Sequence, residues 1–185
     1  LSKYSGYITT GDARAVYTLS NESALGHKIG GEITTFSDFQ YFKNLSSLSL
    51  SDLSELPELT SLSVVSSSLT SLSIKNCSLE SDDLVDIASL ASLASCDLSD
   101  NLIEDISALS ALSGVSHLSI RSNFIKDITP LLLMQRLTSL DLSENPLSNI
   151  SSLSLLTGLT SLSLSNCSFA SCDALKSLTS LTYLD

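Results

Sequence analysis

The 185-residue chain is predicted to form a right-handed α/β solenoid, with parallel strands on its concave face and short 3-10 or α-helical turns on its convex face. The stretch 137–147 has Leu at four fixed positions and Asn at a fifth. The same positions recur every 22 residues, as at Leu118, Leu140, Leu162 and Leu184. The second half of each period spaces its apolar residues by three, which suits a 3-10 turn or short helix.

The strand half of a period is the Leu-x-Leu stretch, for example Leu140 and Leu142. Alternate side chains of a strand point to opposite faces, so both leucines point inward. Asn123 and Asn145 occupy the point where the chain leaves the strand, and Cys167 takes this place in the next period. An Asn here can hydrogen-bond backbone groups of adjacent coils. The pattern L-x-x-L-x-L-x-x-N/C-x-L is typical of leucine-rich repeats, which stack around a continuous core.

The chain is divided into two parts. Residues 1–32 lack the repeat and are predicted to form an N-terminal cap over one end of the core. Residues 33–185 are predicted to form the leucine-rich repeat domain, with irregular repeats over 33–95 and regular 22-residue repeats over 96–185.

In the irregular part, Leu48–Leu50 is predicted to be the first clear strand. We predict further strands at Leu62–Val64 and Leu72–Ile74, which follow after 14 and 10 residues. Ten residues leave no room for a convex helix, so that coil would return by a tight turn. The next step, from Leu72 to Cys96, is 24 residues, and Ser81-Asp82-Asp83 is predicted to start a helix.

In the regular part, one polar position precedes each convex turn and is predicted to cap it. This position holds Ser107, Thr129, Ser151 and Asp173. Pro130 follows Thr129 at the first helical position, where Pro is tolerated.

Composition excludes several classes of function. The net charge is −11, with 9 Lys and Arg against 20 Asp and Glu, so nucleic acids and anionic membranes are not expected as partners. No run of 18 apolar residues occurs, so direct membrane insertion is not expected either. Aromatic residues make up only 5% of the chain and Trp is absent, so the core is predicted to be aliphatic.

The four cysteines all occupy inward positions of the repeat: Cys77, Cys96, Cys167 and Cys172. They are therefore predicted to be reduced and mostly buried, where a free Cys behaves as a small hydrophobe. A disulfide framework would place paired cysteines in capping regions. No metal site is expected, since the cysteines fall in three different columns and no C-x-x-C occurs.

Residues that alternate with the inward leucines point out of the predicted strands and form the concave face. They are Ser47, Ser49, Ser51; Ser61, Ser63, Val65; Ser71, Ser73, Lys75; Ser95, Asp97, Ser99; His117, Ser119, Arg121; Ser139, Asp141, Ser143; and Ser161, Ser163, Ser165. The face is mostly serine, whereas binding hot spots favour Trp, Tyr and Arg.

The candidate binding residues on this face are Lys75, Asp97, His117, Ser119, Arg121, Asp141, Ser143 and Tyr183. Asp97 and Asp141 should flank Ser119 on neighbouring strands, diagonal to His117 and Arg121. One interpretation is a docking site for a protein or a glycan, with Arg121 as the anchor and the two aspartates as acceptors. The other is a solvated patch whose charges neutralise each other.

Catalysis is not predicted, and no cofactor is expected. Ser119, His117 and either Asp97 or Asp141 are the residue types of a nucleophilic triad. However, His117 and Ser119 are two residues apart on one strand, about 6.5–7 Å between Cα atoms. No Gly-rich elbow accompanies them. A Ca²⁺ site is not expected either, because Asp97, Asp141 and Asp185 lie two coils apart.

The segment Leu181–Asp185 is the start of a strand without an Asn position or a convex return. A solenoid end of this kind exposes leucines and an unpaired strand edge. We therefore expect this end to be covered, either by a homodimer through the C-terminal solenoid end or by a further domain.

Residues 96–185 carry the pattern I-x-D-I-x-x-L at Ile103–Leu109 and Ile125–Leu131. In this they resemble the 22-residue repeats of the internalins, surface adhesins of Gram-positive bacteria. The segment Gly31–Leu45 and the Leu-Thr-Ser-Leu steps resemble secreted leucine-rich repeat proteins of gut Bacteroidetes. The same repeat is also similar to an intracellular eukaryotic regulator of a Ser/Thr phosphatase.

These resemblances imply two functions. The first is a non-enzymatic interaction module of a secreted or surface-anchored bacterial adhesion protein, located outside the cell or at its surface. The alternative is a cytoplasmic leucine-rich repeat scaffold or phosphatase-regulator-like protein.

Overall fold

The computed structural model describes residues 17–20, 42–53, 56 and 59–185. Within these residues the chain forms one parallel sheet of eight strands in sequence order. The strands are β1 (Thr18–Ser20), β2 (Ser47–Ser51), β3 (Ser71–Lys75), β4 (Ser95–Asp97), β5 (His117–Ser119), β6 (Ser139–Asp141), β7 (Ser161–Ser163) and β8 (Tyr183–Leu184). The predicted solenoid is therefore confirmed.

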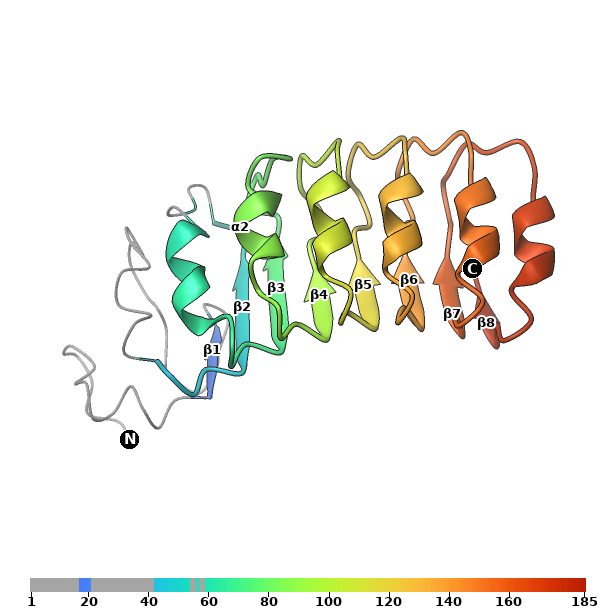
Figure 1. Cartoon of the computed structure of the whole chain (residues 1–185). Coiled ribbons are helices and arrows are strands. Elements are labelled where there is room, and N and C mark those ends of the chain that lie inside the picture. Colours follow the sequence, from blue (N-terminus) through green and yellow to red (C-terminus); the bar gives the residue numbers. More distant parts are fainter. Residues whose placement is uncertain (1–16, 21–41, 54–55, 57–58) are drawn as a thin grey trace.

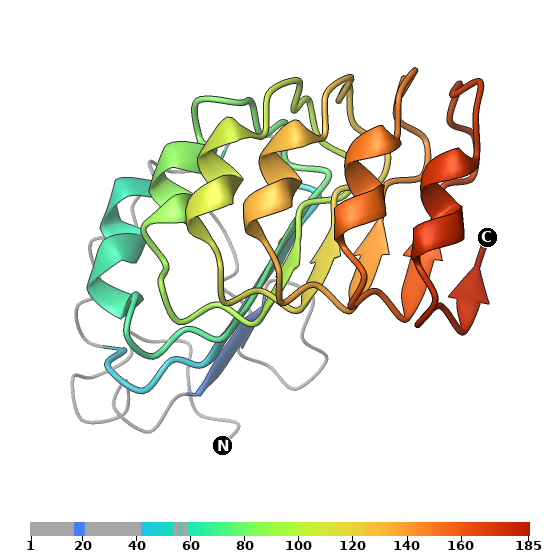
Figure 2. The same cartoon turned by 45° about the vertical axis from the view of Figure 1, so that its right-hand side comes forward.

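Short helices return the chain from one strand to the next. They are η2 (Leu59–Val65), α2 (Leu84–Ala88), η3 (Ser107–Ala111), η4 (Thr129–Leu133), η5 (Ser151–Leu155) and η6 (Asp173–Ser177), and all but α2 are 3-10 helices. The helices line up in one row and the strands in another, with the core between them (Figures 1 and 2). Most of the predicted N-terminal cap lies outside the described residues. Its one described element, β1, pairs with β2.

The core is a set of aliphatic columns. Leu48, Leu72, Cys96, Leu118, Leu140, Leu162 and Leu184 are paired from strand to strand in this order. All of them except Leu184 are at most 2% exposed. No buried side-chain nitrogen or oxygen lacks a hydrogen-bond partner in the described part of the chain.

The strand predicted at Leu62–Val64 was wrong. These residues lie in the 3-10 helix η2, where Leu62 is buried and Val64 is 54% exposed. The spacing of Leu59, Leu62 and Val65 by three residues turns all of them inward, as a helical turn requires. Strand β2 pairs directly with β3, with Leu48 opposite Leu72, so this coil is 24 residues long and matches the next one.

The helix predicted after Ser81-Asp82-Asp83 is confirmed as α2, and Pro130 lies at the start of η4. The predicted caps, however, are not the capping groups. The Ser107 N–H and hydroxyl both donate to Asp105 Oδ1, at 2.8 and 2.6 Å, and Thr129 donates twice to Asp127 in the same way. The acceptor lies two residues before the first helical residue because the turn begins earlier than the spacing alone indicates.

Three buried asparagines join neighbouring coils. They are Asn101, Asn123 and Asn145, each at most 4% exposed. Asn145 accepts the Ile125 N–H (3.1 Å) and donates to three carbonyls, those of Ile120, Leu142 and Ser143 (2.9, 2.9 and 3.2 Å). The predicted role of the Asn position is thus confirmed.

The three asparagines form one ladder of hydrogen bonds between coils, the asparagine ladder. Hydroxyl groups at the residue before each strand form a second ladder beside the sheet. Thr138 Oγ1 donates to the Ser116 carbonyl at 3.1 Å, and Thr160 and Thr182 donate to the same position one coil earlier at 3.0 Å. Ala94 interrupts this ladder. Hydrogen bonds between side chains and backbone therefore fasten successive coils at both ends of the strands.

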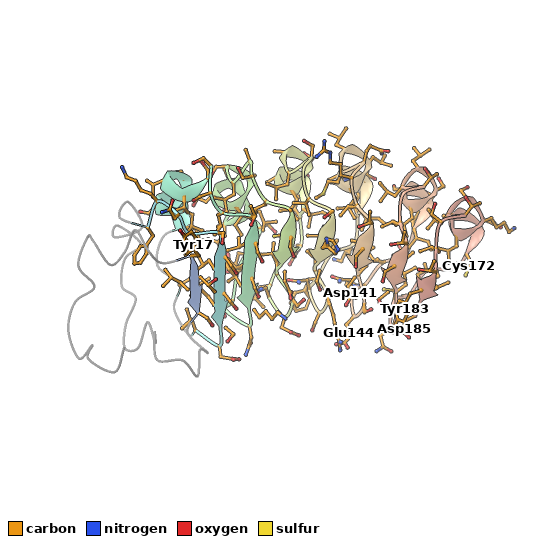
Figure 3. The ribbon with its side chains drawn as sticks, turned by 90° about the horizontal axis from the view of Figure 1, so that it is seen from below. Tyr17, Asp141, Glu144, Cys172, Tyr183 and Asp185 are labelled. Carbon is orange, nitrogen blue, oxygen red and sulfur yellow. The ribbon has the colours of Figure 1, made fainter. Side chains whose placement is uncertain are left out.

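The four cysteines are free, as predicted, but they are not all buried. Cys77 and Cys96 are buried, Cys167 is half-buried, and Cys172 is exposed. Ile128 and Ile150 fill the column of Cys172 in earlier coils and are buried there. Among the described residues no further coil packs over Cys172, which lies beside the last helix (Figure 3). Burial, together with the charge of Asp97, raises the pKa of the Cys96 thiol to about 12.

Replacing Asn145 by Ala should lower the free energy of unfolding by about 3 kcal/mol, because buried backbone groups lose their partners. The control is Asn149→Ala, at an exposed Asn that accepts only the Ser151 N–H at 2.8 Å. Its loss should cost about 1 kcal/mol. Urea denaturation measures both values. Equal losses of unfolding free energy would show that the buried hydrogen bonds of Asn145 stabilise the fold no more than the exposed one of Asn149.

Thiol reactivity should follow burial. In the native protein Cys172 is expected to react first with a disulfide reagent and Cys167 more slowly, while Cys77 and Cys96 should react only on unfolding. The unfolded, unreduced protein should titrate as four thiols. A count of two or zero would instead reveal disulfides.

The capping aspartates should make stability depend on pH. Hydrogen bonds from Ser107 and Thr129 lower the pKa values of Asp105 and Asp127 from 3.8. Since the folded pKa lies below the unfolded one, the stabilisation is complete above the unfolded pKa and disappears as pH falls through the folded pKa. Asn149 forms the same cap without titrating. The double substitution Asp105→Asn/Asp127→Asn should therefore fold normally yet lose less stability between pH 6 and pH 3, measured by urea denaturation at each pH.

Candidate functional site

The face of the sheet opposite the helices carries the predicted binding residues. Alternation is confirmed for most of them, since the first and second outward residues of β2 to β7 are all exposed or half-buried. The third outward position differs. There Ser51, Ser99 and Ser143 are at most 7% exposed, whereas Lys75 and Arg121 extend into solvent. Ser143 is therefore not available as a binding residue, contrary to the prediction.

One other prediction about this face was wrong. Ser61, Ser63 and Val65 belong to η2 and not to the sheet, so they do not contribute to it. Tyr183 lies in β8 opposite Ser161 and is 54% exposed, so it remains accessible. Asp141 and Glu144 both lie on the side of the ribbon away from the helices (Figure 3).

The centre of the face is arranged as predicted along the backbone. Ser119 pairs with Asp97 on one side and with Asp141 on the other. His117 pairs with Ser95 and Ser139. Asp97 and Asp141 thus flank Ser119 directly.

The ion pairs differ from those predicted. Arg121 pairs with Glu144, and not with Asp97 or Asp141. Asp97 instead pairs with Lys75 at 2.6 Å, and Asp141 Oδ1 accepts the Ser143 N–H at 2.9 Å. The hydrogen bond and charge of Glu144 raise the pKa of Arg121, and the nearby charges of Asp141 and Asp100 add to this rise.

Glu144 was missed in the sequence because it lies in the turn beyond the strand. It belongs to a column of turn residues with positive φ: Asp52, Asn76, Asp100, Ser122, Glu144 and Asn166. Most of these are Asp or Asn, the types that favour this conformation, and that regularity is the signal that marks the column. Each N–H from Asp52 to Glu144 donates to a carbonyl of the next coil, so the turns extend the sheet.

The triad residue types are present but are not connected. His117 Nδ1 is hydrogen-bonded to Ser116 Oγ at 2.8 Å. The Ser119 and Ser99 hydroxyls are 2.8 Å apart, and Ser99 donates to Asp97 at 2.6 Å. No base therefore contacts the Ser119 hydroxyl.

The part of the chain that the structure describes has neither a metal-binding cluster nor a membrane-spanning helix. No three His, Cys, Asp or Glu side chains come together as metal ligands would. None of the helices there has both the length and the apolar character to cross a membrane.

The parallel strands, the 3-10 returns and the asparagine ladder define the class: this chain is a leucine-rich repeat protein. In particular it resembles the internalins of Listeria. It is 25% identical to an internalin C2 from Listeria monocytogenes, covering 96% of this chain and 84% of that one, with a TM-score of 0.69. A second Listeria internalin is 26% identical, covering 96% and 69%, with a TM-score of 0.72.

The fold is also similar to the ectodomain of the Arabidopsis thaliana receptor kinase GASSHO1/SCHENGEN3. That protein is 24% identical, with 80% of this chain and 19% of that one covered and a TM-score of 0.58. No protein-family profile and no curated protein matches the chain. The comparisons give no support to the resemblance to proteins of Bacteroidetes.

Proposed function

We propose that this chain is a non-enzymatic module that binds a protein ligand on its concave face, as part of a secreted or surface-anchored bacterial adhesion protein. Its similarity to two Listeria internalins over 96% of its length supports this proposal. The plant receptor ectodomain of the same fold was solved in complex with Casparian strip integrity factor 2, which illustrates ligand binding by such a solenoid.

The observation that carries the proposal is the position of the charged residues and His117 on the concave face, which is otherwise mostly serine. Lys75, Asp97, His117, Arg121 and Asp141 all fall on or just after β3 to β6, in the middle of the sheet. The side chains of His117 and Arg121 belong neither to the core, which is made by the inward leucines, nor to the Asn and Thr hydrogen bonds that fasten the coils. Asp97 and Asp141 also have a structural contact, since each accepts the backbone N–H two residues further on. Exposed ion pairs add less than about 1 kcal/mol to stability. A role in ligand binding explains charged residues at these positions.

One observation favours the alternative, a cytoplasmic scaffold. The chain has four free cysteines, and Cys172 is exposed. Extracellular proteins more often pair their cysteines, whereas thiols persist in the reducing cytosol. Both functions require a protein ligand and differ in the compartment that supplies it.

The proposal is tested by the substitution His117→Ala/Arg121→Ala. Both side chains are exposed, so the free energy of unfolding should change by less than about 1 kcal/mol. Wild type and variant are used to probe an array of purified extracellular and cytosolic protein domains. The variant should lose at least tenfold in affinity for the domains that the wild type binds, because it lacks the cation and the imidazole at the centre of the face.

The matched control is Lys126→Ala/Arg136→Ala, which removes two exposed basic residues outside the strands. This control should bind as the wild type does. If the His117/Arg121 variant also binds every domain normally, the concave face does not carry the interaction. Whether the bound domains are extracellular or cytosolic distinguishes the two functions.

A further inference from the structure

A second surface of the molecule lies beside the concave face, where the strands end. In each coil from β3 to β7 the positive-φ turn residue is followed by the Asn position, and the residue directly after the Asn position points outward. In three successive coils this residue is apolar: Leu102, Phe124 and Pro146, which we call the exit rim. Leu102 is 46% exposed and Phe124 is 51% exposed, and Pro146 is also exposed. The same position holds exposed serines, Ser78 and Ser168, in the coils on either side.

Hydrogen bonds join the coils that carry the rim residues. The Phe124 N–H donates to Ile103 O at 2.8 Å, and the Ile125 N–H donates to Asn145 Oδ1 at 3.1 Å. Strands of neighbouring coils are about 4.8 Å apart. The three side chains therefore form a continuous apolar strip across three coils, and they contribute nothing to the core, which is complete without them.

The same coils carry an excess of negative charge next to the strip. Arg121 pairs with Glu144, and Asp100 and Asp141 lie close enough for their charges to act on the guanidinium. The charges of three carboxylates thus act on one cation. Asp100 and Glu144 are each two residues before a rim residue, so acidic and apolar side chains alternate along this edge.

We propose that the exit rim binds an extended segment of a protein partner that carries a Lys or Arg next to an aliphatic or aromatic residue. The apolar side chain packs on Phe124 and Leu102, and the cation lies among Asp100, Asp141 and Glu144. The excess negative charge repels acidic segments, nucleic acids and anionic lipids. The inference rests on the proposed function in one respect, that the partner is a protein, and it adds a contact region where the strands end, which shares Asp141 with the concave face.

The experiment uses the full chain as bait for a phage-displayed library of random linear 12-residue peptides. Enriched peptides should contain Lys or Arg within a few positions of a large apolar residue. For a synthetic peptide of this kind, Kd should rise at least tenfold with Phe124→Ser and with Asp100→Asn, measured by fluorescence anisotropy. Both changes are at exposed positions, and Asn tolerates the positive φ of Asp100, so the melting temperature should stay unchanged.

Two variants serve as controls. Leu155→Ser removes an apolar side chain that is 60% exposed on the convex helix η5, and it should change Kd by less than twofold. His117→Ala/Arg121→Ala should leave peptide affinity unchanged or increase it, because it adds to the negative excess at the rim. The same variant should weaken a ligand of the concave face, so the two proposals predict opposite results.

Several outcomes would overturn the inference. One is the absence of enriched peptides with a basic and an apolar residue. Another is unchanged binding to Phe124→Ser, or an equal loss with Leu155→Ser, which would place the peptide on the convex face. Peptides that lose affinity only with His117→Ala/Arg121→Ala would leave the concave proposal standing and remove the rim. Self-association of the wild type that Phe124→Ser abolishes in sedimentation would show that the rim contacts a second copy of this chain instead.

Discussion

The solenoid depends on satisfying the backbone where each strand ends. There the chain leaves the sheet and turns toward the convex side, and its N–H and C=O groups lose their strand partners while they remain buried. Asn145 provides one acceptor and two donor hydrogens, and it contacts backbone groups of Ile120 and Ile125 one coil away. Without such a residue, buried polar groups would be left unpaired at a cost of about 1–3 kcal/mol each. Cys167 occupies the same column but offers only a thiol, which donates to Leu142 O at 3.4 Å.

The turn before each Asn position determines which surfaces the protein presents. Residues such as Asp100 and Glu144 adopt positive φ, and their N–H groups donate hydrogen bonds to carbonyls of the next coil. The residue before the turn then points out of the sheet, as Arg121 does, and the residue after the Asn points outward at the edge, as Phe124 does. One local conformation, repeated in every coil, therefore creates both the concave face and the exit rim.

Within a repeat, the residues that stabilise the fold differ from the residues that are exposed for binding. Leucines, ladder asparagines and threonines hold the coils together, and their identities follow from packing and hydrogen bonding. The outward positions are mostly serine, which is small and polar and leaves the sheet open to a partner. Lys75, Asp97, His117, Arg121, Asp141 and Phe124 lie on or just after β3 to β6. These positions can therefore form an interaction surface without contributing to the core.

The sequence by itself determined the solenoid, the inward columns, the ladder and the pairing of Ser119 with two aspartates, because each depends on a period that one chain can display. Tertiary structure alone decided the rest. Leu62 and Val64 alternate as the residues of a strand would. However, β2 pairs directly with β3, so the sheet has no place for a strand between them and these residues form part of η2. Arg121 forms an ion pair with Glu144 because the turn of the next coil places that carboxylate next to the guanidinium. Cys172 is exposed in the described structure, whereas Ile128 and Ile150 at the same position of earlier repeats are buried, because burial at this position depends on the neighbouring coil and not on the pattern within one repeat.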